Sequence, residues 1–425
     1  MIPKAARVYA PLSLLLLIGL ARGFAPVSPP PAKAFIGLGS STVSTLEAEK
    51  STSDGPQDDE SDSIVVRAPL KFMGPYPTIS LRFPNLATAA QRQRNVSGIS
   101  LDFVVDTAAN VNTINGQVAQ ELALEIVGQA ASGVSATGPM KGASTFSLGD
   151  AELERAQFIV ENQQKVEEED EQEVAQTNLR NETFTFMTNL TASALPVANP
   201  FSAGLLSLSF LQCFQGGVEF GWGQYDPKEK KVLEYPSVSF HENEITLPAE
   251  TTTRKNAATI TPVPLTNLPS IMINVNGVKM PALLDTGSPL TVLNSAAAQA
   301  AGVAPKLSQT TKSNKKNQGF FAKLQNRLEE GNAARRGELL TVAGPNGSVQ
   351  LVQSAEPVRV AVVGDEQEIE LGHDPSHVYV GDLPGLAALN GLGVDSPPAV
   401  VLGMDVLQKR PKMLLRANQN KVYFY

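Results

Sequence analysis

The feature that most constrains this chain is a short pattern that occurs twice. In each copy, a run of apolar residues ends in Asp-Thr, and small residues follow. The first copy is Leu101–Val111 and the second is Pro281–Leu290. The apolar run predicts a buried strand, and the small residues after it let the backbone turn sharply. Each copy therefore predicts a buried strand that presents one aspartate, Asp106 or Asp285, at its end.

The similarity continues on both sides of the two aspartates. When Asp106 is aligned with Asp285, Asn115 falls on Asn294, and each asparagine precedes a helix-like run, where Asn is a favoured N-cap. Apolar segments and strand-like endings further downstream also correspond. They are Gly204–Leu211 with Val400–Leu407, and Val218–Phe220 with Val422–Phe424. An internal repeat at this spacing implies two related lobes.

The paired aspartates indicate a particular chemistry, provided that the lobes bring them together. Like charges in close contact cannot both ionise easily, so such a pair holds one proton and titrates as a unit. The ionised member activates a water molecule, and the protonated member polarises a carbonyl oxygen. A lone Asp-Thr-Gly is weak evidence because short motifs recur by chance, but two copies in matching context are much stronger.

The two segments resemble the catalytic loops of aspartic proteases, both pepsin-like and retropepsin-like. Their motif is an apolar run, then Asp-Thr/Ser-Gly and a small residue, and Asp285-Thr286-Gly287-Ser288 matches it fully. The resemblance implies an all-β, bilobal double barrel with a cleft between the lobes. It also implies an aspartic-type endopeptidase without a cofactor, which hydrolyses polypeptides with a water activated between Asp106 and Asp285.

The resemblance also gives roles to the residues beside the aspartates. Thr107 and Thr286 are expected to tie the two loops together across the seam through hydroxyl–backbone hydrogen bonds. Ser288 is expected to bond the outer oxygen of Asp285 and hold that carboxylate ionised, and Gly287 keeps the glycine of the motif. Which aspartate carries the shared proton stays open.

Lobe one departs from the family motif at two positions. Ala108 stands where lobe two has Gly287, and Ser207 stands where lobe two has Gly403. If the backbone at Ala108 has a positive φ or touches the other loop, the methyl group costs about 1 kcal/mol or more. Two alternatives therefore stay open. One is a catalytically decayed protease-like protein that binds peptides or protein partners between its lobes, and the other is an active homodimer built from lobe two.

Two hairpins that contain Gly and Pro are candidates for flaps over a bound substrate, with an ordinary surface hairpin as the alternative. Gly138, Pro139 and Met140 lie at the centre of the lobe-one hairpin, and Gly344 and Pro345 lie in its lobe-two counterpart. The pepsin-like flap carries a tyrosine, which the lobe-one hairpin lacks. The resemblance therefore favours the retropepsin-like branch.

Composition and charge argue against several other functions. The net charge is −8, which does not suggest a nucleic-acid partner. The single cysteine, Cys213, excludes an intrachain disulfide and favours a reducing compartment. His373 and His377 are close in sequence, but a turn lies between them and no cysteine is near, so no metal site is expected.

The N-terminal residues indicate targeting. Basic residues precede the short apolar run Leu12–Leu20, and small residues precede Phe24, so residues 1–23 are predicted to be a signal peptide. Residues 24–63 are predicted to be a transit peptide and a disordered segment. The combination resembles the bipartite plastid presequence of algae with secondary plastids. It predicts a plastid protein that meets a membrane only transiently, with secretion or the endomembrane lumen as the alternative.

The remaining chain divides into two lobes, in a protein expected to be a monomer with pseudo-two-fold symmetry. The predicted parts are lobe one at 64–226, a polar connector at 227–260 and lobe two at 261–425. Within the connector, Val238–Leu247 is a candidate strand of a sheet that joins the lobes. Ile271–Met280 predicts a hairpin with an Asn-Gly turn. An acidic insertion at 161–182 and a basic one at 306–336 are predicted to be solvated loops.

Overall fold

The fold is described from a computed structural model of the 425-residue chain. The residues described are 18–19, 63–129, 133–135, 138–140, 142–161, 185–195, 201–226, 228–242, 255–264, 266–306, 333–344, 347–372, 374–389 and 397–425. Several sequence predictions lie outside them and stay predictions. They concern nearly all of the signal and transit peptides, most of both insertions, His373 and Pro345.

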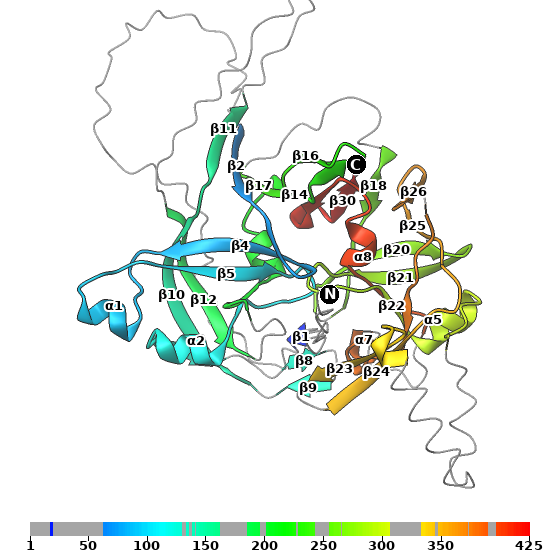
Figure 1. The fold of residues 1–425 in the computed structure, drawn as a ribbon, viewed down its shortest axis with the longest axis horizontal. Coiled ribbons are helices and arrows are strands. Elements are labelled where there is room, and N and C mark those ends of the chain that lie inside the picture. The colour runs from blue at the N-terminus through cyan, green and yellow to red at the C-terminus, as the bar shows by residue number, and fades with distance from the viewer. Residues whose placement is uncertain are drawn as a thin grey trace, which may run out of the picture.

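Lobe one is built on a strongly curved sheet, seen at the left of Figure 1. The described strands form an eight-stranded sheet, and the two strands next to Asp106 lie near its middle. In spatial order the strands are β3 (Lys71–Met73), β4 (Tyr76–Phe83), β5 (Ile99–Val105), β13 (Gly204–Leu206), β6 (Thr113–Ile114), β12 (Thr185–Ala194), β10 (Ser144–Leu153) and β7 (Ile126–Gln129). The short helices are α1 (Ala89–Gln93), α2 (Gly116–Glu121) and α3 (Leu208–Leu211).

Lobe two repeats this plan around Asp285. Its described strands form a ten-stranded sheet, at the right of Figure 1. In spatial order they are β23 (Leu339–Gly344), β24 (Gly347–Gln353), β27 (Tyr379–Val380), β22 (Val292–Leu293), β28 (Val400–Leu402), β21 (Val278–Leu284), β20 (Pro269–Val275), β25 (Val360–Val363) and β26 (Glu368–Glu370), with β19 (Thr261–Pro262) on β20. The helices are α5 (Ser295–Ala300), α7 (Pro384–Leu389), α8 (Met404–Leu407) and the 3-10 turn η2 (Ala417–Gln419).

A third sheet contains strands from both halves of the chain. Its described strands, in spatial order, are β11 (Gln157–Glu161), β2 (Ser63–Pro69), β17 (Ser237–His241), β14 (Gly217–Gly221), β29 (Lys412–Arg416), β30 (Lys421–Phe424) and β18 (Ala257–Thr259). The lobes meet where β14 pairs antiparallel with β29, with Val218 opposite Leu415. The connector therefore supplies β17, which overlaps the start of the predicted strand Val238–Leu247, to this shared sheet.

The shared sheet corrects one detail of the predicted repeat. The sequence aligned Val218–Phe220 with Val422–Phe424, but β14 lies beside β29 at the centre, and β17 and β30 flank this pair. The counterpart of β14 is therefore β29. The alignment failed here because both C-terminal strands are short and apolar, and only their pairing order distinguishes them.

The remaining described elements are hairpins. One consists of β15 (Gln224–Asp226) and β16 (Lys231–Glu234). The other consists of β8 (Gly133–Ser135) and β9 (Gly138–Met140), and the short segment β1 (Ile18–Gly19) pairs with β8. An aromatic cluster connects lobe one to the shared sheet. Its rings, Phe186, Phe210, Phe214 and Phe240, lie with centroids 4.7 to 6.1 Å apart. Such pairs add stability beyond the apolar area that they bury.

The predicted all-β, two-lobed fold is confirmed, and its local features agree with the sequence. Asn115 and Asn294 cap α2 and α5, since each side chain accepts a backbone N–H from the first turn. The predicted hairpin turn also forms, with φ of 49° at Asn276 and 89° at Gly277. No helix within the described residues is long and apolar enough to cross a membrane.

Candidate active site

Each aspartate stands one residue beyond the end of a buried strand. Asp106 follows β5 and Asp285 follows β21. The Asp106 N–H donates to the Leu206 carbonyl at 2.9 Å, and the Asp285 N–H donates to the Leu402 carbonyl at 3.1 Å. Because each acceptor belongs to the parallel neighbour strand, β13 or β28, the two aspartates are fixed in equivalent ways.

The two aspartate loops are bound to one another by threonines, as expected. The Thr107 N–H donates to Thr286 Oγ1 at 3.1 Å, and the Thr286 N–H donates to Thr107 Oγ1 at 3.0 Å. Each hydroxyl then donates onward to the other lobe, Thr107 to the Leu284 carbonyl at 2.6 Å and Thr286 to the Val105 carbonyl at 2.7 Å. Both threonines are fully buried, so no water competes for these bonds.

The threonine bonds bring the two carboxyl groups together. Asp106 and Asp285 are each only 1% exposed, and they lie close enough for the charge of Asp106 to act on Asp285. Two like charges that are buried together cannot both ionise easily. We therefore expect the pair to hold one proton at a pH where an isolated aspartate would be ionised.

Burial and mutual repulsion shift the titration of both groups. Burial raises the pKa of Asp106 to about 7, although the Ala108 N–H, 2.8 Å from Oδ1, favours the ionised form. Burial also raises the pKa of Asp285 well above its ordinary value, and the neighbouring charge of Asp106 raises it further. Both shifts favour the protonated form, so the pair retains a proton at a pH where an isolated aspartate would be ionised.

The expected role of Ser288 is wrong. Its hydroxyl donates to the Leu290 carbonyl at 2.8 Å instead of bonding Asp285. The serine closes its own turn because that carbonyl lies within reach two residues later. The N–H groups of Gly287 and Ser288 face Asp285 and act against the rise of its pKa, yet no described residue meets hydrogen-bond geometry with Asp285 Oδ1. Ser288 therefore does not hold this carboxyl group ionised through its hydroxyl.

The methyl group of Ala108 lies in an apolar surrounding. Ala108 is fully buried and does not have a positive φ. It packs into a cluster of lobe two that includes Leu268, Leu283 and Val401. Gly287, at the equivalent position, has no such room, because a Cβ there would lie 2.4 to 2.7 Å from the carboxyl atoms of Asp106. The two loops are therefore related but not interchangeable.

The second departure, Ser207, belongs to a hydrogen-bonded group behind the Asp106 loop. The N–H and the hydroxyl of Ser207 both donate to Asn112 Oδ1, at 2.9 and 3.0 Å. The same hydroxyl lies 2.8 Å from the hydroxyl of Ser209. The added side chain is thus fully satisfied, so Ser207 does not place an unpaired polar group behind the dyad.

Lobe two has a corresponding hydrogen-bonded group behind the Asp285 loop, made of different residues. The N–H of Gly403 donates to Thr291 Oγ1 at 3.1 Å, and Thr291 Oγ1 donates to Asp405 Oδ1 at 2.7 Å. Thr291 stands six residues after Asp285, as Asn112 stands six after Asp106. Asn112, Ser207 and Ser209 of lobe one thus stand where lobe two has Thr291, Gly403 and Asp405. Each set forms a closed hydrogen-bonded group. Sequence reasoning missed Asn112, although its alignment with Thr291 could have indicated it.

The predicted flap residues lie in two hairpins. Gly138, Pro139 and Met140 form β9, which pairs with β8, and this hairpin contacts the lobe-two helix α7. Gly344 ends β23, where it pairs with Gly347 of β24. The lobe-one hairpin therefore reaches from its own lobe to the other, as a covering flap would.

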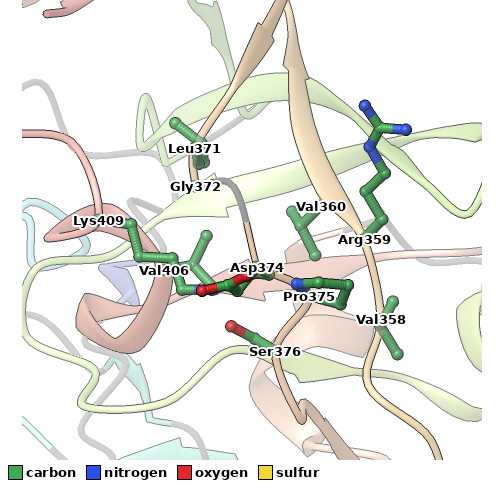
Figure 2. Close-up of a pocket in the computed structure, with 10 residues that line it drawn as sticks. All are labelled: Val358, Arg359, Val360, Leu371, Gly372, Asp374, Pro375, Ser376, Val406 and Lys409. Atoms are coloured by element: carbon green, nitrogen blue, oxygen red, sulfur yellow. The ribbon is translucent and has the colours of Figure 1, made fainter.

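A small hollow in lobe two lies apart from the dyad (Figure 2). Val358, Val360, Pro375, Val406 and Lys409 are among its lining residues, and none of the lining residues belongs to either aspartate loop. Its volume of about 10 Å³ holds about one water molecule. Nor do the described residues contain a group of three or more His, Cys, Asp or Glu side chains that could hold a metal ion.

Comparison with known proteins gives similarity of structure only. No protein-family model matches the chain, and no curated protein matches it in sequence. Two solved structures that match are basic 7S globulin from soybean, with 10% identity and a TM-score of 0.40, and edgp, with 11% identity and a TM-score of 0.38. Each match covers 85% of this chain and 94% of the other chain. The function proposed below therefore rests on the geometry of the site.

The contact between Gly287 and Asp106 predicts a coupling that unfolding experiments can measure. Gly287→Ala should lower the free energy of unfolding by about 3 kcal/mol, since the new methyl group overlaps the Asp106 carboxyl group. In a chain that carries Asp106→Ala, which removes the overlapping atoms, the same change should cost at least about 2 kcal/mol less. Equal costs in the two backgrounds, from denaturant titrations, would contradict the contact.

Proposed function

We propose that the protein is an aspartic-type endopeptidase. The observation that carries this proposal is the pair of buried carboxyl groups, Asp106 and Asp285, which come from equivalent loops that the threonine hydrogen bonds join. A protein without this chemistry gains nothing from the arrangement, because burying two acids together costs stability whenever either of them ionises. Its substrate is an extended polypeptide bound between the lobes, beneath the β8–β9 hairpin.

In the reaction that we propose, Asp106 is the base and Asp285 is the acid. Asp106, as the carboxylate, takes a proton from a water molecule, whose oxygen attacks the peptide carbonyl carbon. Asp285, as the carboxylic acid, gives its proton to the carbonyl oxygen, which yields a tetrahedral diol. The proton on Asp106 then passes to the amide nitrogen, the C–N bond breaks, and a hydroxyl proton of the diol returns to Asp285. An acid and an amine leave, and the pair regains its single proton.

The departures of lobe one do not argue for the non-catalytic alternative. Ala108 occupies an apolar pocket, and Ser207 is satisfied by Asn112 and Ser209. Neither displaces the threonine bonds or the pairing of the carboxyl groups. A binding protein that lost its activity would be under no constraint to keep both acids buried and in contact.

Removing either acid tests the proposal directly. Asp106→Asn and Asp285→Asn should each lower cleavage of an unfolded protein substrate by at least about 1,000-fold, since each amide abolishes one proton transfer. Asp374→Asn, at an exposed aspartate outside the dyad, should leave the rate unchanged. If the wild type binds peptides without cleaving them, the decayed binding protein replaces the proposal, and activity that survives in both variants would place the reaction elsewhere.

The pH dependence of cleavage follows from the raised pKa values. Asp106 must be ionised to act as a base, and burial raises its pKa from 3.8 to about 7. We therefore expect kcat/KM to rise with pH through about 7 and to fall again once Asp285 loses its proton. The measurement is a series of initial rates in buffers of constant ionic strength. A maximum near pH 3 or 4, with a decline before pH 6, would contradict these protonation states.

A further inference from the structure

The register of the sheets places a different residue opposite each aspartate. In lobe one, β4 pairs with β5 so that Thr78 faces Val104. Two residues further along this antiparallel ladder, Tyr76 comes opposite Asp106. In lobe two, Ser270 faces Leu283, and the same two-residue step brings Leu268 opposite Asp285. Residues opposite one another in an antiparallel pair project to the same face, so Tyr76 and Leu268 hold equivalent positions beside the dyad.

The two side chains differ in surroundings. Leu268 is fully buried and packs with Ala108 inside the apolar cluster of lobe two. Tyr76 is only partly buried, and it packs against the group formed by Val104, Ala109 and Leu205. Since Ala109 belongs to the Asp106 loop, this packing fixes the ring beside the dyad. Lobe one thus presents a phenol where lobe two presents a hydrocarbon.

The hydroxyl of Tyr76 is available as a donor. Among the described residues, none forms a hydrogen bond with it, although the backbone carbonyl of Tyr76 accepts one from Thr78. Burial together with the carboxyl groups of Asp285 and Asp106 raises the pKa of Tyr76 to about 12, so both acids lie close enough to act on the phenol. The phenol therefore keeps its proton at the pH at which Asp106 ionises.

We propose that the Tyr76 hydroxyl is a third functional group of the site and donates a hydrogen bond to the backbone of a bound peptide. This inference rests on the proposed peptidase function and deepens it. The Ala108 N–H donates to Asp106, and the N–H groups of Gly287 and Ser288 face Asp285, so the backbone serves both carboxyl groups and leaves the phenol to the substrate. Because Leu268 offers no matching donor, the contact forms on the lobe-one side alone and orients the peptide across the dyad.

The test removes only the hydroxyl. Tyr76→Phe keeps the packing of the ring and should lower kcat/KM for an unfolded protein substrate by about 10- to 100-fold. The matched control is Tyr225→Phe, at a tyrosine that is 59% exposed in β15, and it should leave kcat/KM unchanged. Thermal unfolding should be the same for both variants and the wild type. A Tyr76→Phe protein with unchanged kcat/KM would overturn the inference.

Binding of a pepstatin-type peptide inhibitor, measured by calorimetry, separates this inference from the proposed function. If the wild type binds the inhibitor but cleaves nothing, the peptidase proposal fails, and a weaker affinity in Tyr76→Phe than in Tyr225→Phe still supports the hydroxyl contact. If the wild type binds and Tyr76→Phe binds equally well, the inference fails alone. If the wild type neither binds nor cleaves, both fail.

Discussion

The buried hydrogen bonds between Thr107 and Thr286 are the interaction on which the rest of the site depends. They join the backbone of one aspartate loop to the side chain of the other, and they are made wholly inside the protein. A small shift of one lobe against the other would break several of them at once and leave buried donors unsatisfied, which is costly. The shared sheet, where β14 pairs with β29, holds the same two halves together at a second place. The distance between the carboxyl groups is therefore fixed by the whole fold.

Within this symmetric frame, the chemistry is asymmetric. Ala108 and Gly287 are equivalent, yet the methyl group of Ala108 packs in an apolar cluster, whereas a methyl group at Gly287 would overlap the carboxyl group of Asp106. Behind the aspartate loops, lobe one has Asn112, Ser207 and Ser209 where lobe two has Thr291, Gly403 and Asp405. The polar groups of both sets are hydrogen-bonded to one another. Differences between the lobes thus leave the loops in place while giving the two acids unlike surroundings. Such differences are what an acid–base pair requires, because its two members must hold different protonation states.

Much of this arrangement could be predicted from the sequence, because its signals are local. The apolar run before each aspartate, the asparagine caps and the Asn-Gly turn each depend on a few neighbouring residues. The bond expected from Ser288 was wrong because a nearby carbonyl, that of Leu290, competes for the hydroxyl. Tyr76 could not be found, since its place depends on the register between β4 and β5. The cost expected at Ala108 depended on a backbone angle and on packing against the other lobe, which no local pattern reveals.

The central claim is that Asp106 and Asp285 form one buried, proton-sharing pair. Its most direct test compares the free energy of unfolding of the wild type and Asp285→Asn over a range of pH. Both carboxyl groups have folded-state pKa values above the 3.8 of the unfolded chain, so the folded wild type holds protons that the unfolded chain has released. Its stability should therefore fall as the pH rises from about 4 through about 7. The variant, which has one fewer acid to ionise, should gain about 2–4 kcal/mol relative to the wild type over that range. If the unfolding free energies of the wild type and Asp285→Asn change with pH in parallel, the claim that the two acids form a proton-sharing pair is wrong.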